Sequence, residues 1–271
     1  MKRDLDEELV WSLHTETPSL DQIRRLTAIG ANINATDDAG DSILVHAVRD
    51  SRVPTNVVAF LVEQGAYVNA VNKGGTCVLG MAVWNRRLQR ETVELLVALG
   101  ADVNAVDKDG SSVLMNAVSN SRLPKEMIEC LIELGANTNT VDHRGESVLG
   151  HAITCWRKDI IETLIDHGAN VHFGSEEALY HAVIEDMIGE GEPELVACLL
   201  RNGANPNIIN EESTVLDFAE EFHFDSQTMS QDHDECNARH LRNACAVVEL
   251  LKDAGAKPYS FWENVQNLSG S

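Results

Sequence analysis

Short apolar segments alternate with polar, glycine-containing turns along most of this chain of 271 residues. Leucine and valine recur three and four residues apart in segments such as "VVAFLVEQG" and "TVELLVALG", which is the spacing of one buried face of an α-helix. Each such segment ends at a Gly-Ala pair, where glycine can adopt the left-handed conformation that terminates a helix. The pattern therefore predicts a series of short helices, each with a single apolar face.

The pattern is a repeat of about 35 residues. A turn with glycine leads to a Ser or Cys and a first helix, "SILVHAV", "CVLGMAV", "SVLMNAV" or "SVLGHAI"; a polar loop and a second helix follow. Neither helix can bury its apolar face alone, so the pairs are expected to stack around one continuous core. The Gly-Ala pairs begin at Gly30, Gly65, Gly100, Gly135, Gly168, Gly203 and Gly255. The first helices are expected to be capped by Ser42, Ser112, Ser147 and Thr214.

The segment "LLVALGADVNAVDKDGSSVL" closely resembles ankyrin repeats, whose consensus runs GxTPLHxA, a second helix, and LLxxGADVNAxD. The resemblance covers residues from about 20 to 257. It implies an all-α repeat solenoid of about seven helix pairs with projecting β-hairpins, in which the hairpins and first helices form a concave side. The chain departs from the consensus at the His of TPLH, which is Val45, Gly80, Met115 and Gly150 in four repeats.

One solenoid is expected over residues 1–257, and 258–271 are expected to form a disordered tail. Within the solenoid, an N-terminal capping pair takes 1–34, central repeats take 35–212, and a C-terminal repeat takes 213–257. The last repeat contains an insertion at about 222–240, where the spacing of Gly-Ala pairs grows to 52 residues. The polar composition of this insertion is typical of a mobile loop.

Charge is distributed unevenly along the chain, which has a formal net charge of -22. Residues 159–238 hold 19 acidic side chains and one basic side chain, Arg201. The electric field of so many acidic side chains disfavours binding to nucleic acid and anionic membranes, and it speeds encounter with a basic partner. Solubility alone is the simpler interpretation of this charge. The acidic N-terminus, the lack of an apolar run of about 20 residues and six scattered cysteines without CxxC pairs favour a soluble, cytoplasmic protein. We also expect a monomer.

Two sets of residues recur at fixed positions and are candidates for binding. The residue before a recurring alanine of the first helix is polar in four repeats, and equivalent helices about 10 Å apart would form a polar ladder. The ladder residues could bind a partner or bond to neighbouring backbone; they are His46, Asn116, His151 and His181. Five residues after that alanine lie Arg52, Arg87, Arg122 and Arg157.

With Arg49 and Trp84, these arginines predict a cationic and aromatic rim of the type enriched in interface hot spots. The alternative is that they pair with acids of an adjacent repeat and hold the stack together. The ankyrin resemblance also implies that partners contact the tips of the β-hairpins and the exposed residues of the first helices. By position, the tip residues are Asp38, Asp41, Lys73, Asp109, Arg144 and Glu146.

No catalytic motif is present: the sequence has no GxSxG, HExxH, phosphate-binding glycine loop or Walker-type lysine. We therefore expect no enzyme activity, cofactor or metal. The insertion holds His233, Asp234, Cys236 and His240, but their spacing matches no standard zinc pattern. The sequence predicts a non-catalytic module that binds another protein. The more specific hypothesis is that this partner is basic and that the module inhibits it. A scaffold or recognition subunit acting with a separate enzyme, and metal binding by the insertion, are the alternatives.

Overall fold

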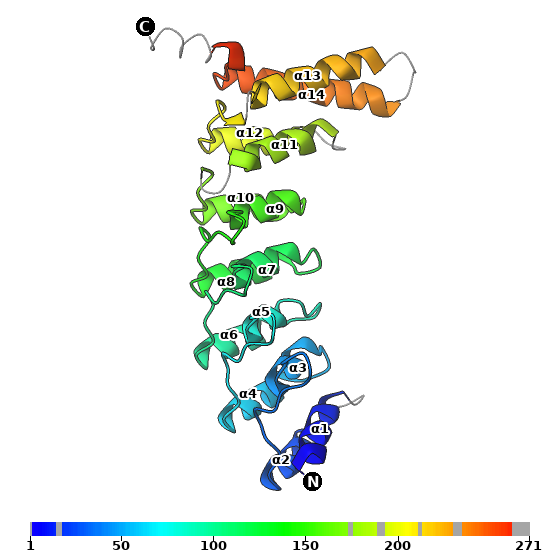
Figure 1. The fold of residues 1–271 in the computed structure, drawn as a ribbon, viewed down its shortest axis with the longest axis vertical. Helices are drawn as coiled ribbons and strands as arrows, with labels where there is room; N and C mark the ends of the chain where they lie inside the picture. Colours follow the sequence, from blue (N-terminus) through cyan, green and yellow to red (C-terminus); the bar gives the residue numbers. More distant parts are fainter. Residues whose placement is uncertain are drawn as a thin grey trace. The chain divides into compact units, whose positions relative to one another are not determined.

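A computed structural model describes the backbone of residues 2–14, 18–172, 176–188, 193–210, 213–229 and 235–261. The chain divides into two compact units, Met1–His151 and Ala152–Ser271, here called the N-terminal and C-terminal units. Each is an array of paired helices, as expected for an all-α repeat solenoid (Figure 1). No helix among the described residues is long and apolar enough to cross a membrane.

The N-terminal unit is built from consecutive helix pairs. First helices pack on first helices, α3 on α5 and α5 on α7, and second helices follow the same order, α4 on α6 and α6 on α8. Helices this short are marginal alone in water, so each depends on its neighbours in the stack. The pairs are α1 (Lys2–Leu13) with α2 (Leu20–Ala28), α3 (Ile43–Arg49) with α4 (Thr55–Glu63), α5 (Val78–Ala82) with α6 (Arg90–Ala98), and α7 (Val113–Ser119) with α8 (Lys125–Glu133).

Leucines at repeated positions form the core between these helices. Leu44, Leu79 and Leu114 are at most 1% exposed on the first helices, and Leu61 and Leu96 are 0% exposed on the second. Burying one such side chain contributes roughly 1.5–3 kcal/mol. The core is therefore one continuous layer to which each repeat adds the same few leucines.

The predicted helix ends are confirmed. The hydroxyls that cap the first helices accept a backbone N–H three residues further on, at 3.0–3.4 Å, and belong to Ser42, Ser112, Ser147 and Thr214. Cys77 takes the same role with its sulfur, 3.2 Å from the N–H of Gly80. The second helices end at glycines in the left-handed region, for example Gly65 with φ 94°. Local sequence thus sets where each helix begins and ends.

A short β-hairpin, here called a finger, precedes each of the first helices that begin at Ile43, Val78, Val113 and Val148, and a single antiparallel bridge closes it. The bridges are Thr36 with Ser42, Val71 with Cys77, Val106 with Ser112 and Val141 with Ser147. The fingers of the N-terminal unit are therefore residues 36–42, 71–77, 106–112 and 141–147. They correspond to the β-hairpins that the resemblance implied.

An asparagine before each of the first three fingers ties its repeat to the next. The Nδ2 of Asn69 donates to the carbonyl of Gly100 at 2.8 Å, and its Oδ1 accepts the N–H of Asp102 at 2.9 Å. Asn34 and Asn104 make the equivalent pairs of bonds one repeat before and one repeat after. These asparagine brackets, to which the sequence analysis gave no role, fix the spacing between repeats.

The C-terminal unit has the same design, but α11, α13 and α14 are longer than the helices of the N-terminal unit. α9 (Val148–Thr154) crosses the boundary between the units, and α11 packs against α12, α13 and α14. Asn207 bonds to Gly255 and Lys257, so the bracket recurs across the last repeat. The other elements are α10 (Lys158–Asp166), α11 (Glu176–Ile188), α12 (Glu194–Arg201), the antiparallel pair β1 (Ile209–Asn210) and β2 (Ser213–Thr214), α13 (Val215–Met229) and α14 (Glu235–Asp253).

The expectation of a loop over 222–240 is wrong for the described part of the insertion. Residues 222–229 extend α13, residues 235–240 begin α14, and these two helices pack together (Figure 1). The physical reason is that no glycine or proline interrupts the sequence between residues 207 and 254. Residues 230–234, and the predicted tail from residue 262 onward, lie outside the described residues.

A buried carboxylate links two helices of the C-terminal unit. Asp186 of α11 is 2% exposed, and its Oδ2 accepts the N–H of Val196 in the first turn of α12 at 2.6 Å. Its Oδ1 lies 3.9 Å from the Nζ of Lys158. Burial raises the pKa of Asp186 to about 6, against these favourable contacts.

We expect the asparagine bracket to contribute directly to stability. Replacing Asn69 with alanine removes two inter-repeat hydrogen bonds and should lower the free energy of unfolding by about 1–2 kcal/mol in urea denaturation. Asn56, exposed on α4, is the matched control, because alanine there only improves helix propensity. Equal stability of the two variants would contradict a structural role for the bracket.

Asp186 gives a pH-dependent prediction. Because its pKa is higher in the folded chain than in the unfolded chain, its protonated form stabilises the fold, and that contribution disappears as pH rises from about 4 to above 6. Asp186→Asn should therefore gain up to about 3 kcal/mol relative to wild type between pH 4 and pH 7.5, measured by denaturant titrations along the pH range. A difference that does not change with pH would contradict the raised pKa.

Candidate functional site

The finger tips of the N-terminal unit are rigidly organised by their own side chains. One side-chain oxygen at the start of each tip accepts the N–H groups two and four residues further on, at 2.8–3.0 Å. These Asx-turn residues are Asp37, Asn72, Asp107 and Asp142. An Asx turn mimics a backbone turn, so each tip holds its shape without a partner.

Backbone hydrogen bonds join neighbouring tips into one row. The N–H of Lys73 donates to Ala39 at 3.0 Å, that of Lys108 to Gly74 at 3.2 Å, and that of His143 to Asp109 at 2.9 Å. The approach is close enough to require glycine: a Cβ added at Gly110, which has φ 80°, would lie 2.8 Å from the backbone nitrogen of His143. The row of fingers is thus a fixed surface within the N-terminal unit.

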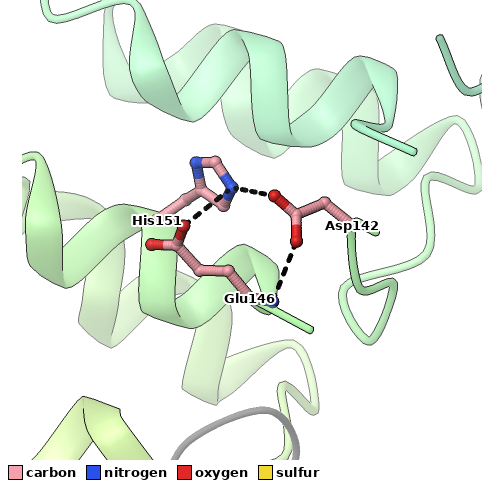
Figure 2. Close-up of side chains that lie close together, drawn as sticks. All are labelled: Asp142, Glu146 and His151. Atoms are coloured by element: carbon pink, nitrogen blue, oxygen red, sulfur yellow. Dashed lines mark hydrogen bonds and ion pairs between the residues drawn. The ribbon is translucent and has the colours of Figure 1, made fainter. Parts of the chain in front are cut away.

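The polar ladder faces the fingers where it is described. The Nε2 of His46 lies 3.0 Å from Asp37 Oδ2, and the Nε2 of His151 lies 3.5 Å from Asp142 Oδ2 (Figure 2). Asn116 has no side-chain hydrogen bond among the described residues, and the side chain of His181 lies outside them. The two histidines are therefore engaged with their own fingers, with only a small part of each side chain exposed.

The same contacts set the ionisation of the turn carboxylates. Burial opposes the charge of Asp37, but the N–H groups of Asp41 and Ala39 and the nearby His46 outweigh it and lower its pKa. At Asp142, burial is outweighed by the N–H of Glu146 and by the guanidinium and N–H of Arg144, which also lower the pKa. Both carboxylates are therefore negatively charged at neutral pH and attract cationic groups.

The four arginines after the first helices are not equivalent. Arg52, Arg87 and Arg122 are exposed, whereas Arg157 is 7% exposed, so a surface contact does not fit Arg157. The reason is its loop, which is two residues shorter than the loops of the three preceding repeats and folds its guanidinium onto Asp159 at 3.3 Å. Arg52 pairs with Asp50. These two ion pairs lie within single repeats.

Two asparagines that the sequence analysis did not single out support this rim. Asn85 and Asn120 are buried and donate to the carbonyls of Val48 and Val83 in the preceding repeat, at 2.9 and 2.8 Å. Their Oδ1 atoms accept the N–H groups of the rim arginines that follow two residues later. A polar residue three positions after the recurring alanine, repeated at a 35-residue interval, was the available signal.

The predicted tip residues divide into exposed and buried positions. Asp41 is only 5% exposed because it accepts hydrogen bonds from Arg49 and from Asn72, both at 3.0 Å, so a role in partner contact does not fit it. Glu146 is intermediate. The exposed positions are Asp38, Lys73, Asp109 and Arg144 at the tips, with Arg49 and Trp84 on the first helices and the loop that follows.

An apolar stripe along the fingers was also missed. Val71, Val106 and Val141 begin successive fingers and are 57%, 54% and 38% exposed. Their signal in the sequence is a valine two positions after an asparagine, repeated every 35 residues. The finger surface thus combines exposed apolar side chains with charges of both signs.

A family model for ankyrin repeats, in three copies, matches residues 13–107, 87–175 and 114–210. These overlapping matches together run from the end of α1 to the end of β1. A search of curated proteins finds no significant match.

We expect substitutions at two ladder positions to change the stability of the fold by different amounts. His46→Leu removes the bond to Asp37 and an edge contact with the ring of His14, and should cost about 1 kcal/mol in urea unfolding. Asn116→Leu removes no hydrogen bond of the described residues and should keep or increase stability. Similar losses at both positions would contradict the different engagement of these residues.

Proposed function

The chain belongs to the ankyrin-repeat family, and we propose that it binds another protein through the finger row and adjoining first helices of its N-terminal unit. Ankyrin repeats are generally protein–protein interaction modules and are typically not catalytic. The observation that supports this location is the bonding between tips, which holds the exposed side chains in place before any partner arrives. A preorganised surface loses little entropy on binding.

The chemistry of this surface suits a protein partner. Exposed valines on the fingers and Trp84 on the rim offer apolar contact area, and Asp38, Asp109 and Arg144 surround them with charge. Protein interfaces commonly have this arrangement of apolar anchors within a polar border. The rim arginines Arg87 and Arg122 would add hydrogen-bond donors for the carboxylates of a partner.

The partner that we propose is basic, and the acidic C-terminal unit would attract it. The ion pairs between described residues of this unit are Arg157 with Asp159, Lys158 with Asp186, and Lys252 with Glu220. They involve few of the 19 acids between residues 159 and 238. A chain that covers a basic surface in this way would inhibit a partner that uses that surface itself. A reducing cytoplasmic compartment fits this proposal and the absence of disulfides among the described cysteines.

The binding surface can be tested with matched double variants of the full chain used as immobilised bait in a cell extract. Trp84→Ala with Asp109→Ala should reduce capture of the partner at least about tenfold. Ile29→Ala with Glu91→Ala, which removes one exposed apolar and one exposed acidic side chain outside the fingers and first helices, should capture it as wild type does. Quantitative mass spectrometry reads out the difference, and equal capture by both variants would contradict the proposed surface.

The basic partner is tested separately, with a panel of basic and acidic proteins of similar size. Affinity for the basic members should fall as salt rises from about 50 to 500 mM, because screening shortens the range of the acidic field. Binding measured by interferometry that is indifferent to salt, or equal for acidic proteins, would overturn this part of the proposal. A single stoichiometric complex supports inhibition, whereas capture of several partners at once indicates a scaffold.

A further inference from the structure

Three metal-ligating side chains converge at the fourth finger of the N-terminal unit (Figure 2). The Nε2 of His151 lies 3.5 Å from Asp142 Oδ2 and 3.5 Å from Glu146 Oε2, and all three ligand atoms lie within 4.8 Å of one another. We propose that Asp142, Glu146 and His151 bind a divalent transition-metal ion such as Zn²⁺, with one coordination position left open.

The distances from the histidine nitrogen to the two carboxylate oxygens fit this ion. Zinc bonds to histidine nitrogen and carboxylate oxygen at about 2.0–2.2 Å, so two ligand atoms of a tetrahedral site lie about 3.4 Å apart. The two distances from the Nε2 of His151 are both 3.5 Å. An ion can therefore enter between the imidazole and the carboxylates with little movement of the backbone.

The surroundings already orient the ligands. Asp142 has a fully buried side chain, and its Oδ1 accepts the N–H groups of Arg144 and Glu146 at 2.9 Å, which leaves Oδ2 to face the histidine. The Nδ1 of His151 lies 3.3 Å from the hydroxyl of Ser119 on α7. When the proton of the ring is on Nδ1, this N–H donates a hydrogen bond to the hydroxyl of Ser119, and the lone pair of Nε2 points toward the carboxylates. Metal-bound histidines are usually held by such a bond on the other ring nitrogen.

Arg144 competes for the same position. Its Nε donates to Asp142 Oδ2 at 3.0 Å, and its terminal nitrogen lies 3.5 Å from Glu146 Oε2. The Arg144 side chain is 72% exposed, so it can turn into solvent when an ion arrives. A metal must replace this guanidinium, and removing it should therefore tighten binding.

Comparison with the other fingers of the N-terminal unit shows what is special about the fourth. The first finger has the equivalent residues Asp37, Asp41 and His46, but Asp41 is occupied by Arg49 and Asn72. The second and third fingers lack the histidine and the second carboxylate. The first finger therefore supplies a matched control with the same Asp–His contact and no third ligand.

The test is titration of the chelator-treated full chain with Zn²⁺ and Co²⁺. Calorimetry should show a site that His151→Gln and Glu146→Gln each weaken at least about tenfold, that Arg144→Gln tightens, and that His46→Gln leaves unchanged. Bound Co²⁺ should give the visible bands of a tetrahedral ion without the near-ultraviolet absorption of a thiolate ligand. Thermal unfolding of the metal-free variants checks that they fold.

Two results would overturn the proposal. One is the absence of Zn²⁺ binding by the wild-type chain and by Arg144→Gln at millimolar concentration. The other is binding that survives both His151→Gln and Glu146→Gln, or that shows thiolate absorption with Co²⁺. The latter would place the metal at other ligands, and loss of that binding in His240→Gln would assign it to the insertion in the last repeat.

Discussion

An amide side chain that joins one repeat to the next sets the geometry on which the rest of this structure depends. Asn34, Asn69 and Asn104 each hold the Gly-Ala turn of the following repeat through both a donor and an acceptor. Hydrophobic contact between stacked leucines is strong but has no direction, so it does not fix the distance or register between helix pairs. The paired hydrogen bonds do, and the tips can then bond to one another because their spacing is already fixed.

The candidate sites follow from this order. Since the fingers cannot shift independently, a side chain that begins a tip lies close to the first helix of its own repeat in both the first and the fourth finger. The identity of the residues at those positions then decides the chemistry. His46 meets one available carboxylate, whereas His151 meets two. Functional differences between repeats thus arise from different side chains at equivalent positions of the same backbone arrangement.

The fold could be predicted from sequence because its determinants are local and periodic. Ser42 and its equivalents, the helix-ending glycines and the leucine spacing each specify one feature of one repeat, and the repetition confirms the interpretation. What the periodicity could not give is the partner of each polar group. Asp41 occupies a tip position but is buried by Arg49 and Asn72, and Arg157 keeps its offset while a shorter loop turns it inward. Such contacts depend on several residues at once, and a pattern of single positions contains no information about them.

The bracket of the last repeat, between Asn207 and the turn at Gly255, encloses a pair of helices longer than those of the N-terminal unit. The bracket fixes the base of that helical hairpin, and the additional turns of α13 and α14 lie beyond it. The length of α13 and α14 at the end away from the bracket therefore does not affect how the repeats are aligned at the bracket. This helical hairpin can become longer or shorter by whole helical turns, about 5.4 Å each, while the preceding repeat of the unit keeps its position.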